Sequence, residues 1–407
     1  MKNTLDFKVL MGLPDPWVIE NVELSIEKES VNIFIEWQTR YKVTCPECNE
    51  SCSIKDFATE RKWKHLDIMQ FKTTVISRTP RSNCKIHGVK TINIPWAHSN
   101  SRYTNLFEKF SLEVLISAKN ISKACVLLDI SWDQAQLIQK RSVERGLKRR
   151  ESESLEYIGI DEKSFKKGHD YISVLSDISN SKVIEVVQGR KIESAETLIN
   201  TLSEEQKGSV KAIAMDMWEA YISTAQTILP DADIVHDKYH VSKYLNTAVD
   251  KARKKEHKNF QKTGESILTK TKYFWLKNPD NWSFEEKELY RIFTKENLKV
   301  SRAWSLKETF KDFWDFTYEK CGVNFFKKWF FKATHSRIPS MIKVAYTIKN
   351  HIENLLTYYK HRITNAGSEG LNSFIQGIKS NARGFRNFEN YRISILFHLG
   401  GLDLLPR

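Results

Sequence analysis

The chain has 407 residues, and at about 150 residues per domain this length predicts roughly two to four domains. Hydrophobic residues make up 41% and aromatic residues 12% of the chain, which excludes a disordered protein, and 15 Gly and 9 Pro are too few for a collagen-like or low-complexity chain. The formal net charge of +14 favours a polyanionic partner, nucleic acid before an anionic membrane surface, although charge also serves solubility.

The sequence also indicates a compartment. No apolar run approaches the roughly 20 residues that a membrane span needs. Residues 1–24 lack the uninterrupted apolar core and the cleavage site of a signal peptide. We therefore expect a cytoplasmic, nucleoid-associated protein with no membrane partner.

The first hundred residues are predicted to form short strands. Residues 31–38 and 71–80 alternate apolar and polar side chains, as half-buried strands do. Four of the six cysteines crowd into residues 45–84, which is too local for a disulfide framework in a chain of this length. The basic residues that lie between these cysteines are expected to touch DNA phosphates: Arg61, Lys62, Lys64, Arg78 and Arg81.

Two short motifs in this region have the spacing of metal ligands. Cys45 and Cys48 form a C-x-x-C pair, and Cys84 and His87 form a C-x-x-H pair. Two intervening residues let one tight turn aim both side chains at one ion, and two such turns complete the tetrahedron of a structural Zn²⁺ site. Cys52 is an alternative fourth ligand, but we favour His87 because it shares a turn with Cys84. The competing interpretation is free cysteines in loops.

Residues 101–150 are predicted to contain a helix-turn-helix. The segment 120–146 has the pattern of helix, short turn and helix, with Ser131 in position to cap the second helix. Residues 140–150 carry six basic residues against one Glu, so the second helix suits a DNA major groove. A plain helical hairpin in a bundle is the alternative. The residues predicted to contact DNA are Lys140, Arg141, Arg145 and Lys148.

From residue 155 the pattern changes to that of a mixed α/β domain, after a change from basic to acidic residues at 148–156. Strands are predicted at 156–165, 170–178, 182–189, 210–217 and 231–237, and helices at 193–204 and 218–228. Residues 238–362 are almost wholly helical, and residues 366–400 form a final helical unit. Tryptophans of the long helical block are expected to form its core or, alternatively, to stack on an unpaired base: Trp275, Trp282, Trp304, Trp314 and Trp329.

Two carboxylates follow apolar strand segments of the α/β domain. Asp161 ends the segment YIGID, and Asp216 ends the segment KAIAMD. Carboxylates beside buried strands are costly unless they are used, and they are natural ligands for hard divalent cations. Two such ions, roughly 4 Å apart, can stabilise both the attacking and the leaving oxygen of a phosphoryl transfer. Glu369, near the start of a later helix, is the candidate for a third carboxylate, although any one acid alone could instead be a cap or a surface residue.

A further pair, Asp237 and His240, follows the last predicted strand of this domain. A D-x-x-H at a strand-to-helix turn could bind metal, form a structural hydrogen-bonded pair or orient the DNA strand to be cut. We favour structure or orientation over metal ligation.

The chain resembles bacterial insertion-sequence transposases of the ISL group, which belong to the DDE superfamily with an RNase H-like core. The resemblance runs from about residue 40 to the end and follows all of the motifs above in order. The segments that carry it are SWDQAQLIQKRSVERGL (131–147), GIDEKSFKKGHDYISVLSD (159–177), AMDMWEAYI (214–222), IVHDKYHVSKYLN (234–246) and the stretch 368–402.

The resemblance implies a domain order. It implies a zinc-ribbon DNA-binding domain (1–100), a helix-turn-helix DNA-binding domain (101–150), an RNase H-like mixed-sheet core in two parts (151–240 and 363–407) and an all-α insertion domain between them (241–362). It further implies that Asp161, Asp216 and Glu369 are the catalytic triad, and that the two N-terminal domains recognise terminal inverted repeats. Family members commonly pair C-x-x-C with C-x-x-C, whereas this chain has His87 in the fourth position.

The expected function is therefore that of a DNA transposase. Two Mg²⁺ (or Mn²⁺) ions on the triad would support phosphodiester hydrolysis at the transposon end and transfer of the freed 3′-OH to target DNA. Basic residues at 249–272, together with Lys379, Arg383, Arg386 and Arg392, would hold the DNA backbone. Because two ends must be paired, a homodimer or a higher oligomer is expected in the active complex. The alternatives are a catalytically inert DNA-binding regulator and a nuclease that cuts without joining.

Overall fold

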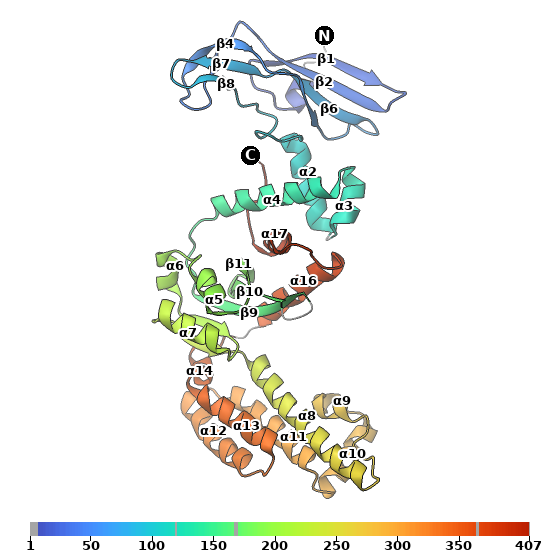
Figure 1. The fold of residues 1–407 in the computed structure, drawn as a ribbon, viewed down its shortest axis with the longest axis vertical. Helices are drawn as coiled ribbons and strands as arrows, with labels where there is room; N and C mark the ends of the chain where they lie inside the picture. Colours follow the sequence, from blue (N-terminus) through green and yellow to red (C-terminus); the bar gives the residue numbers. More distant parts are fainter. Residues whose placement is uncertain (1–6, 119, 167–169, 364–365, 407) are drawn as a thin grey trace. The chain divides into compact units, whose positions relative to one another are not determined.

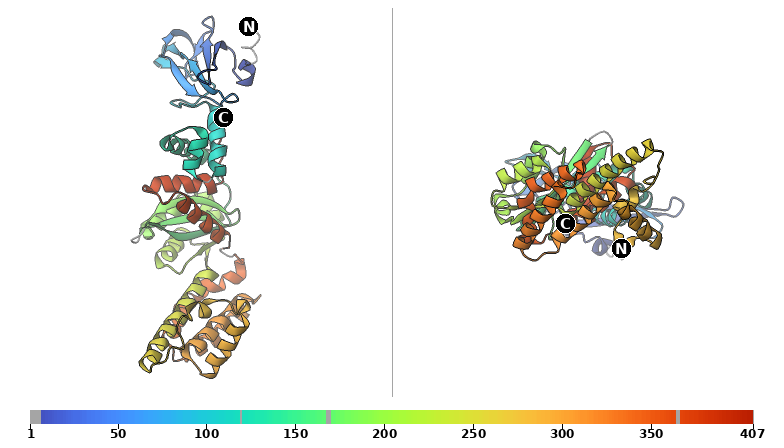
Figure 2. Two further views of the ribbon diagram at one scale, coloured as in Figure 1. Left: turned by 90° about the vertical axis from the view of Figure 1, so that its right-hand side faces the viewer. Right: turned by 90° about the horizontal axis from the view of Figure 1, so that it is seen from below.

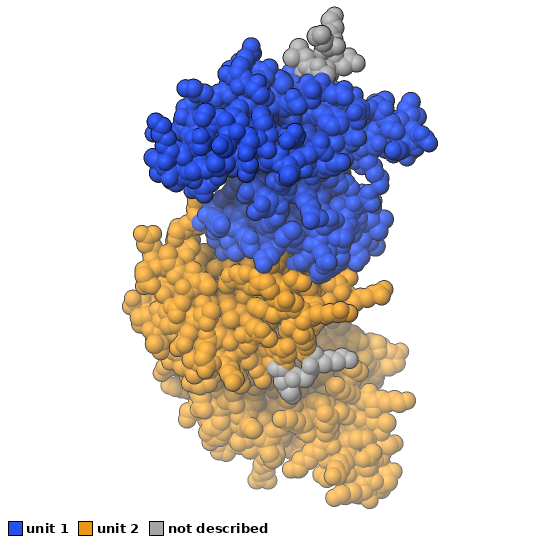
Figure 3. Space-filling model, turned by 45° about the horizontal axis from the view of Figure 1, so that its top comes forward, with its two compact units in different colours: residues 1–150, 402–407 blue, residues 151–401 orange. Residues whose placement is uncertain are grey.

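The computed structural model describes residues 7–118, 120–166, 170–363 and 366–406, and for residues 366–369 it describes the backbone alone. The chain divides into two compact units, residues 1–150 with 402–407 and residues 151–401, which Figure 3 shows in separate colours. Each unit is described by itself below. The mixed α/β layout predicted from the sequence is confirmed.

The first unit holds two four-stranded sheets, with strand orders β1-β2-β6-β5 and β3-β4-β7-β8. The bounds of these strands are β1 (Trp17–Ser25), β2 (Ser30–Trp37), β3 (Val43–Thr44), β4 (Ser51–Phe57), β5 (Arg61–Lys64), β6 (Lys72–Ser77), β7 (Pro80–Cys84) and β8 (Gly88–Thr91). The alternation predicted for β2 is present, because Val31, Ile33 and Ile35 are buried while their neighbours are more exposed. Trp17 and Trp96 pack edge to face in the same core, 4.8 Å between ring centroids.

The two sheets are followed along the chain by helices α2 (Asn105–Ala118), α3 (Ile121–Leu128) and α4 (Trp132–Arg149). A short turn separates α3 from α4, in which Asp129 adopts a left-handed conformation and Ser131 caps α4 through a capping box with Gln134. The predicted helix, turn and helix are therefore present. The Nζ atom of Lys64 donates to the carbonyl oxygens of Leu128 and Asp129, 2.9 Å from each, which ties the sheet to the end of α3.

The second unit is built on a five-stranded mixed sheet of order β11-β10-β9-β12-β13. The bounds of its strands are β9 (Tyr157–Lys166), β10 (Asp170–Asp177), β11 (Lys182–Gln188), β12 (Ala212–Met215) and β13 (Asp233–His236). Strands β9, β10 and β11 are antiparallel, whereas β12 runs parallel to both β9 and β13. The strand predicted at 156–165 is present as β9, and Asp161 lies within it, at the end of its apolar half, because β10 pairs with β9 as far as Lys166.

The helices that accompany this sheet are α5 (Ile192–Ile199), α6 (Glu204–Ser209), α7 (Glu219–Ile228), α16 (Ala366–Asn381) and α17 (Phe388–Leu399). Of these, α5, α7 and α17 pack on its strands. The single helix predicted at 193–204 is in fact α5 followed by a break, since Ser203 caps the separate helix α6. In Figures 1 and 2, α16 and α17 lie against the sheet. The ring of Tyr391 from α17 stacks on that of Phe165 from β9.

The long helical block forms a body of its own beside the sheet in Figures 1 and 2. Its helices are α8 (Lys238–Lys262), α9 (Lys272–Leu276), η1 (Pro279–Asn281), α10 (Phe284–Lys295), α11 (Lys299–Phe310), η2 (Lys311–Trp314), α12 (Glu319–Thr334), α13 (Pro339–Asn350), α14 (Ile352–Leu356) and α15 (Tyr358–His361). All five tryptophans named above are buried in its core, so they form that core and offer no face to a base. Within the described residues, no helix combines the length and apolarity required to cross a bilayer.

Candidate functional site

Two turns of the first unit bring four potential metal ligands together. Cys45 and Cys48 lie in the turn between β3 and β4, while Cys84 ends β7 and His87 precedes β8. The residues that follow the two motifs, Asn49 and Gly88, adopt φ angles of +58° and +67°, which these two residue types tolerate.

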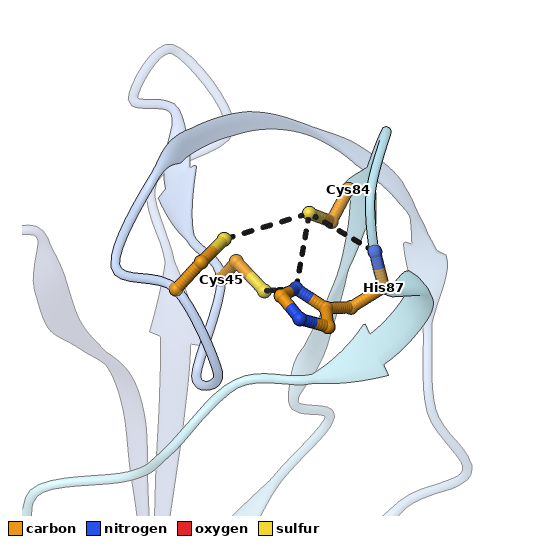
Figure 4. Close-up of side chains that lie close together, drawn as sticks. Cys45, Cys84 and His87 are labelled. Atoms are coloured by element: carbon orange, nitrogen blue, oxygen red, sulfur yellow. Dashed lines mark hydrogen bonds between the residues drawn. The ribbon is translucent and has the colours of Figure 1, made fainter.

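The four ligand atoms have the spacing of a tetrahedral site. The Sγ atoms of Cys48 and Cys84 are 3.7 Å apart, and Nδ1 of His87 lies 3.8 Å from the Sγ atoms of both Cys45 and Cys84 (Figure 4). With Zn–S bonds of about 2.3 Å, a tetrahedron has ligand–ligand edges of about 3.8 Å. Backbone N–H groups of His87 and Ile86 lower the pKa of the Cys84 thiol to about 7, which favours the thiolate.

Cys52, the alternative fourth ligand, lies outside this cluster. The ligand atoms of Cys45, Cys48, Cys84 and His87 all fall within 4.8 Å of one another. The Sγ atom of Cys52 instead lies 3.4 Å from the carbonyl oxygen of Glu50. The donor set of three thiols and one imidazole suits Zn²⁺, and it has the four ligands of a closed, structural site.

The register of the second unit places two acids side by side. Ala212 pairs with Tyr157 and Ala214 with Gly159 across the parallel strands β12 and β9. The same offset sets Asp216, directly after β12, level with Asp161 in β9. Neighbouring strands lie about 4.8 Å apart, and level residues of parallel strands face the same side of a sheet. The two carboxylates can therefore share a cation.

The Asp161 carboxylate is held by three donors. Its Oδ2 accepts from Nδ2 of Asn372 at 2.5 Å and lies 3.1 Å from Nζ of Lys163, and its Oδ1 accepts from the backbone N–H of Glu162 at 2.8 Å. Asn372 comes from α16, so this helix reaches the carboxylate. The side chain is 13% exposed, so solvent still reaches it.

The Asp216 carboxylate faces a histidine. Its Oδ2 lies 3.1 Å from Nδ1 of His240, and its Oδ1 accepts from the backbone N–H of Met217 at 2.6 Å. Burial alone would raise the pKa of Asp216, but the contact with His240 outweighs it, so this pKa is lowered. Burial likewise opposes protonation of His240, yet its pKa is raised because Asp216 stabilises the imidazolium. The pair is thus favoured in its charged form.

The predicted D-x-x-H pair lies at the start of α8. Asp237 caps this helix by accepting from the backbone N–H of Tyr239 at 3.0 Å, and its Oδ2 lies 3.9 Å from Nε2 of His240. His240 is therefore placed between the carboxylates of Asp237 and Asp216. A cleft of about 410 Å³ opens here and is lined by Asp161, Asn372 and His240, among others.

The third predicted acid, Glu369, belongs to α16, but its side chain lies outside the described residues. Sequence reasoning missed Asn372, which contacts Asp161. The signal that could have found it is its spacing, since Asn372 lies three residues after Glu369 and residues three apart share a helix face.

The basic residues predicted to meet DNA through the helix-turn-helix separate into two groups. Lys140 and Lys148 are exposed on α4. Arg141 is partly exposed and donates to the carbonyl oxygen of Asn100 at 3.3 Å. Arg145 is 13% exposed, and its Nη2 lies 2.8 Å from Oε1 of the buried Glu108. The guanidinium of Arg145 thus serves the packing of the first unit.

Other predicted DNA contacts also have partners within their own unit. Arg81 forms a bidentate pair with Asp56 at 2.5 Å, as Arg392 does with Glu185 at 2.6 and 2.8 Å. The Nζ atom of Lys379 donates to the carbonyl oxygen of Ser164 at 2.6 Å. Arg383 and Arg386 are exposed beyond the end of α16.

Comparisons with known proteins point to one family. Residues 158–395 match the sequence model of the ISL3 DDE domain, described as a transposase, and residues 42–87 match that of the zinc finger of the transposases of IS204, IS1001, IS1096 and IS1165. The chain is similar to the transposase for insertion sequence element IS1001 of Bordetella parapertussis, 23% identical over 357 residues that span 86% of this chain and 87% of that protein. It is also similar to the transposase for IS1557 of Mycobacterium tuberculosis, 24% identical over 420 residues, or 95% and 93% of the two chains.

Proposed function

The chain belongs to the ISL3 family of DDE transposases, as its motifs suggested, and is a DNA-cleaving and DNA-joining enzyme; we propose that Asp161, Asp216 and Glu369 form its catalytic site. On this proposal it binds the terminal inverted repeats of an insertion sequence, cuts a phosphodiester bond at each end and transfers the freed 3′-OH to target DNA. The observation that carries it is the register of the parallel strands β9 and β12, which, continued by two residues beyond Ala214 and Gly159, sets Asp216 level with Asp161.

The family implies divalent cations at this site, and the described residues fit them. Carboxylate oxygens are the hard ligands that Mg²⁺ or Mn²⁺ prefers, and Asp161 opens to the cleft described above while Asp216 opens to an adjoining one. We propose two such ions, which would lower the pKa of the attacking water and stabilise the charge on the leaving 3′-oxygen. Glu369 is proposed as the third ligand because Asn372, three residues later in α16, reaches Asp161.

The chain's own side chains would hold these carboxylates ready. Asn372 and Lys163 fix the orientation of the Asp161 carboxylate, and His240 fixes that of Asp216. With Asp237 on its other side, His240 lies between two acids, so we assign Asp237 and His240 a positioning role. Pre-organisation of this kind lowers the cost of arranging charged groups around the reacting phosphate.

We propose that Cys45, Cys48, Cys84 and His87 hold one structural Zn²⁺. The ion would join the turn between β3 and β4 to the β7–β8 hairpin, which are otherwise far apart in the sequence. Because the four ligands leave no open position, the site stabilises the ribbon and takes no part in cleavage.

DNA recognition is proposed for the first unit and for the end of α16. Lys140, Arg141 and Lys148 are the α4 residues open to a phosphate or a base edge, and Arg383 and Arg386 would hold the backbone. Arg145 is not included, because it neutralises the buried Glu108. Pairing of two ends requires at least a dimer in the active complex, and we propose that it acts in the cytoplasm on the nucleoid.

The test uses the purified full-length protein, Mg²⁺ and labelled duplexes that carry the terminal repeats of the element. Wild-type protein is expected to cleave the 3′ ends and join them to a plasmid, and Asp216→Asn is expected to bind the same duplexes without cutting. If the wild type binds tightly but does not cleave in Mg²⁺ or in Mn²⁺, the result would instead support a DNA-binding regulator. If it cleaves without joining, the result would support a nuclease.

A further inference from the structure

The helical block contains a second cleft. It adjoins the cleft lined by Asp161, Asn372 and His240, which we call the catalytic cleft. The second cleft has a volume of about 370 Å³ and lies between α8 and α13, which pack side by side in Figure 1. Asp216, His240 and Lys243 line its head, and His240 and Lys243 also line the catalytic cleft. The two clefts therefore adjoin one another at these side chains, and we call this second one the α8–α13 groove.

One face of each helix builds the α8–α13 groove. On α8 this face runs from His240 through Tyr244, Thr247 and Ala248 to Lys251, and the steps of three and four residues keep these side chains in one row. At 1.5 Å per residue the row extends about 16 Å from the catalytic end. On α13, Ser340, Lys343, Val344 and Thr347 form the matching row, and Oγ of Ser340 donates to the carbonyl oxygen of Ala248 at 2.7 Å.

The chemistry of this lining matches an unpaired nucleic-acid strand. Lys243, Lys251 and Lys343 are exposed cations that can meet phosphates, and Asp216 at the head is the sole carboxylate among the described lining residues. The phenol of Tyr244 is partly exposed, so its ring can stack on a base, and Ala248 and Val344 provide an apolar floor. A positively charged groove with an aromatic platform is the usual construction of a single-strand site.

The size of the α8–α13 groove suits a short unpaired segment. Its volume of about 370 Å³ lies within the roughly 300–1,000 Å³ range of small-ligand pockets, which is the scale of one or two nucleotides.

We propose that the α8–α13 groove binds unpaired nucleotides of the DNA strand beside the scissile phosphate. This inference rests on the proposed function, because it needs a DNA strand in the catalytic cleft. Tyr244 stacks on a base, while Lys251 and Lys343 hold the phosphates that follow. The enzyme thus favours DNA ends that are frayed or already opened next to the cut, since a fully paired end must first lose base pairs to fill the groove.

The experiment compares three probes that share one terminal-repeat duplex: one is fully paired, and the other two carry three unpaired flanking nucleotides, on one strand or on the other. Affinity is measured by fluorescence anisotropy in Ca²⁺ over a salt series, and 2-aminopurine in the unpaired segment reports stacking. Wild type should bind an unpaired probe more tightly. Tyr244→Ala should weaken binding of the unpaired probe alone by roughly 5- to 150-fold and abolish the 2-aminopurine quenching. Tyr244→Phe keeps the aromatic ring, so it should retain both the affinity and the quenching. Lys343→Ala should reduce the salt slope for the unpaired probe by about 0.7.

The matched control is Lys295→Ala, which removes the same charge from α10, a helix that contributes none of the described residues of the groove. It should leave the affinities for all three probes unchanged. Equal binding of paired and unpaired probes by the wild type, or a preference that survives Tyr244→Ala and Lys343→Ala, would overturn the inference. The proposed function fails separately, if wild-type protein with Mg²⁺ does not cleave the paired probe or the unpaired probe.

Discussion

The ion pair between Arg145 and Glu108 offers the sharpest test of how the first unit uses its charges. Glu108 on α2 is 2% exposed, and Arg145 on α4 is its partner at 2.8 Å while also donating to the carbonyl oxygen of Leu404 at 2.8 Å. Replacing Arg145 by Ala leaves a buried carboxylate without its cation. Removing one partner of a buried pair costs about 3–5 kcal/mol.

That cost predicts a measurable loss of protection of the α2 and α4 backbone amides against hydrogen exchange. If α2 and α4 open together, 3–5 kcal/mol corresponds to amide exchange faster by roughly two to four orders of magnitude, up to the limit of global unfolding. Hydrogen exchange followed by mass spectrometry on the full-length protein reads these helices directly. The matched control is Lys148→Ala, because Lys148 lies on the same helix but is exposed.

The two variants should separate stability from DNA binding. Lys148→Ala should leave exchange in α2 and α4 unchanged and weaken binding to duplex DNA, with a salt slope lower by about 1. Arg145→Ala should show the reverse pattern under conditions in which it stays folded. If Arg145→Ala leaves amide exchange in α2 and α4 unchanged and weakens DNA binding as Lys148→Ala does, the structural role of Arg145 is refuted. The prediction from sequence that Arg145 contacts DNA would then be supported.

Three further predictions concern other parts of the chain. Cys52→Ser should keep one zinc per chain by elemental analysis, because Cys52 lies outside the ligand cluster. His87→Ala removes one of the four ligands, so this variant should lose the zinc, and its zinc-ribbon domain should become sensitive to proteolysis. Asp216→Asn should lower cleavage by at least about a thousandfold at unchanged DNA affinity, measured by single-turnover assay and anisotropy. Burial lowers the pKa of His65 to about 4, so on acidification the unfolded chain takes up a proton near pH 6.5, before the folded chain does. The contribution of His65 to the free energy of unfolding should therefore be full above about pH 6.5 and fall by about 3 kcal/mol as the pH drops to 4. In urea denaturation at a series of pH values, His65→Asn should remove this pH dependence.

The parts of the site that sequence predicted are those set by local spacing. The C-x-x-C and C-x-x-H turns need only four residues each, and the left-handed residues Asn49 and Gly88 fall where such turns require them. Asp161 and Asp216 stand out because each ends an apolar run of residues. The spacing could not show that they are level, since that depends on the pairing of β9 with β12.

The parts that sequence missed depend on partners distant along the chain. Asn372 meets Asp161 across 211 residues, and Arg145 meets Leu404 across 259, so no window of sequence contains both members of either pair. The run of basic residues after 140 showed where positive charge gathers, but not which of these side chains already have a partner within the protein. Burial decides that point, and it separates Lys148 from Arg145 on a single helix.

The position of the helical block along the chain links these observations to catalysis. Strand β13 ends at His236, Asp237 caps α8, and His240 in the first turn of α8 meets Asp216, so the block begins at the carboxylates that we propose as catalytic. Helix α8 then continues for 25 residues, about 38 Å, as one rigid element. A strand bound along α8 would therefore be held in fixed register with the carboxylates. Loss of Tyr244 should then impair cleavage most for substrates with unpaired flanks, because in these the groove contact contributes directly to placing the scissile phosphate.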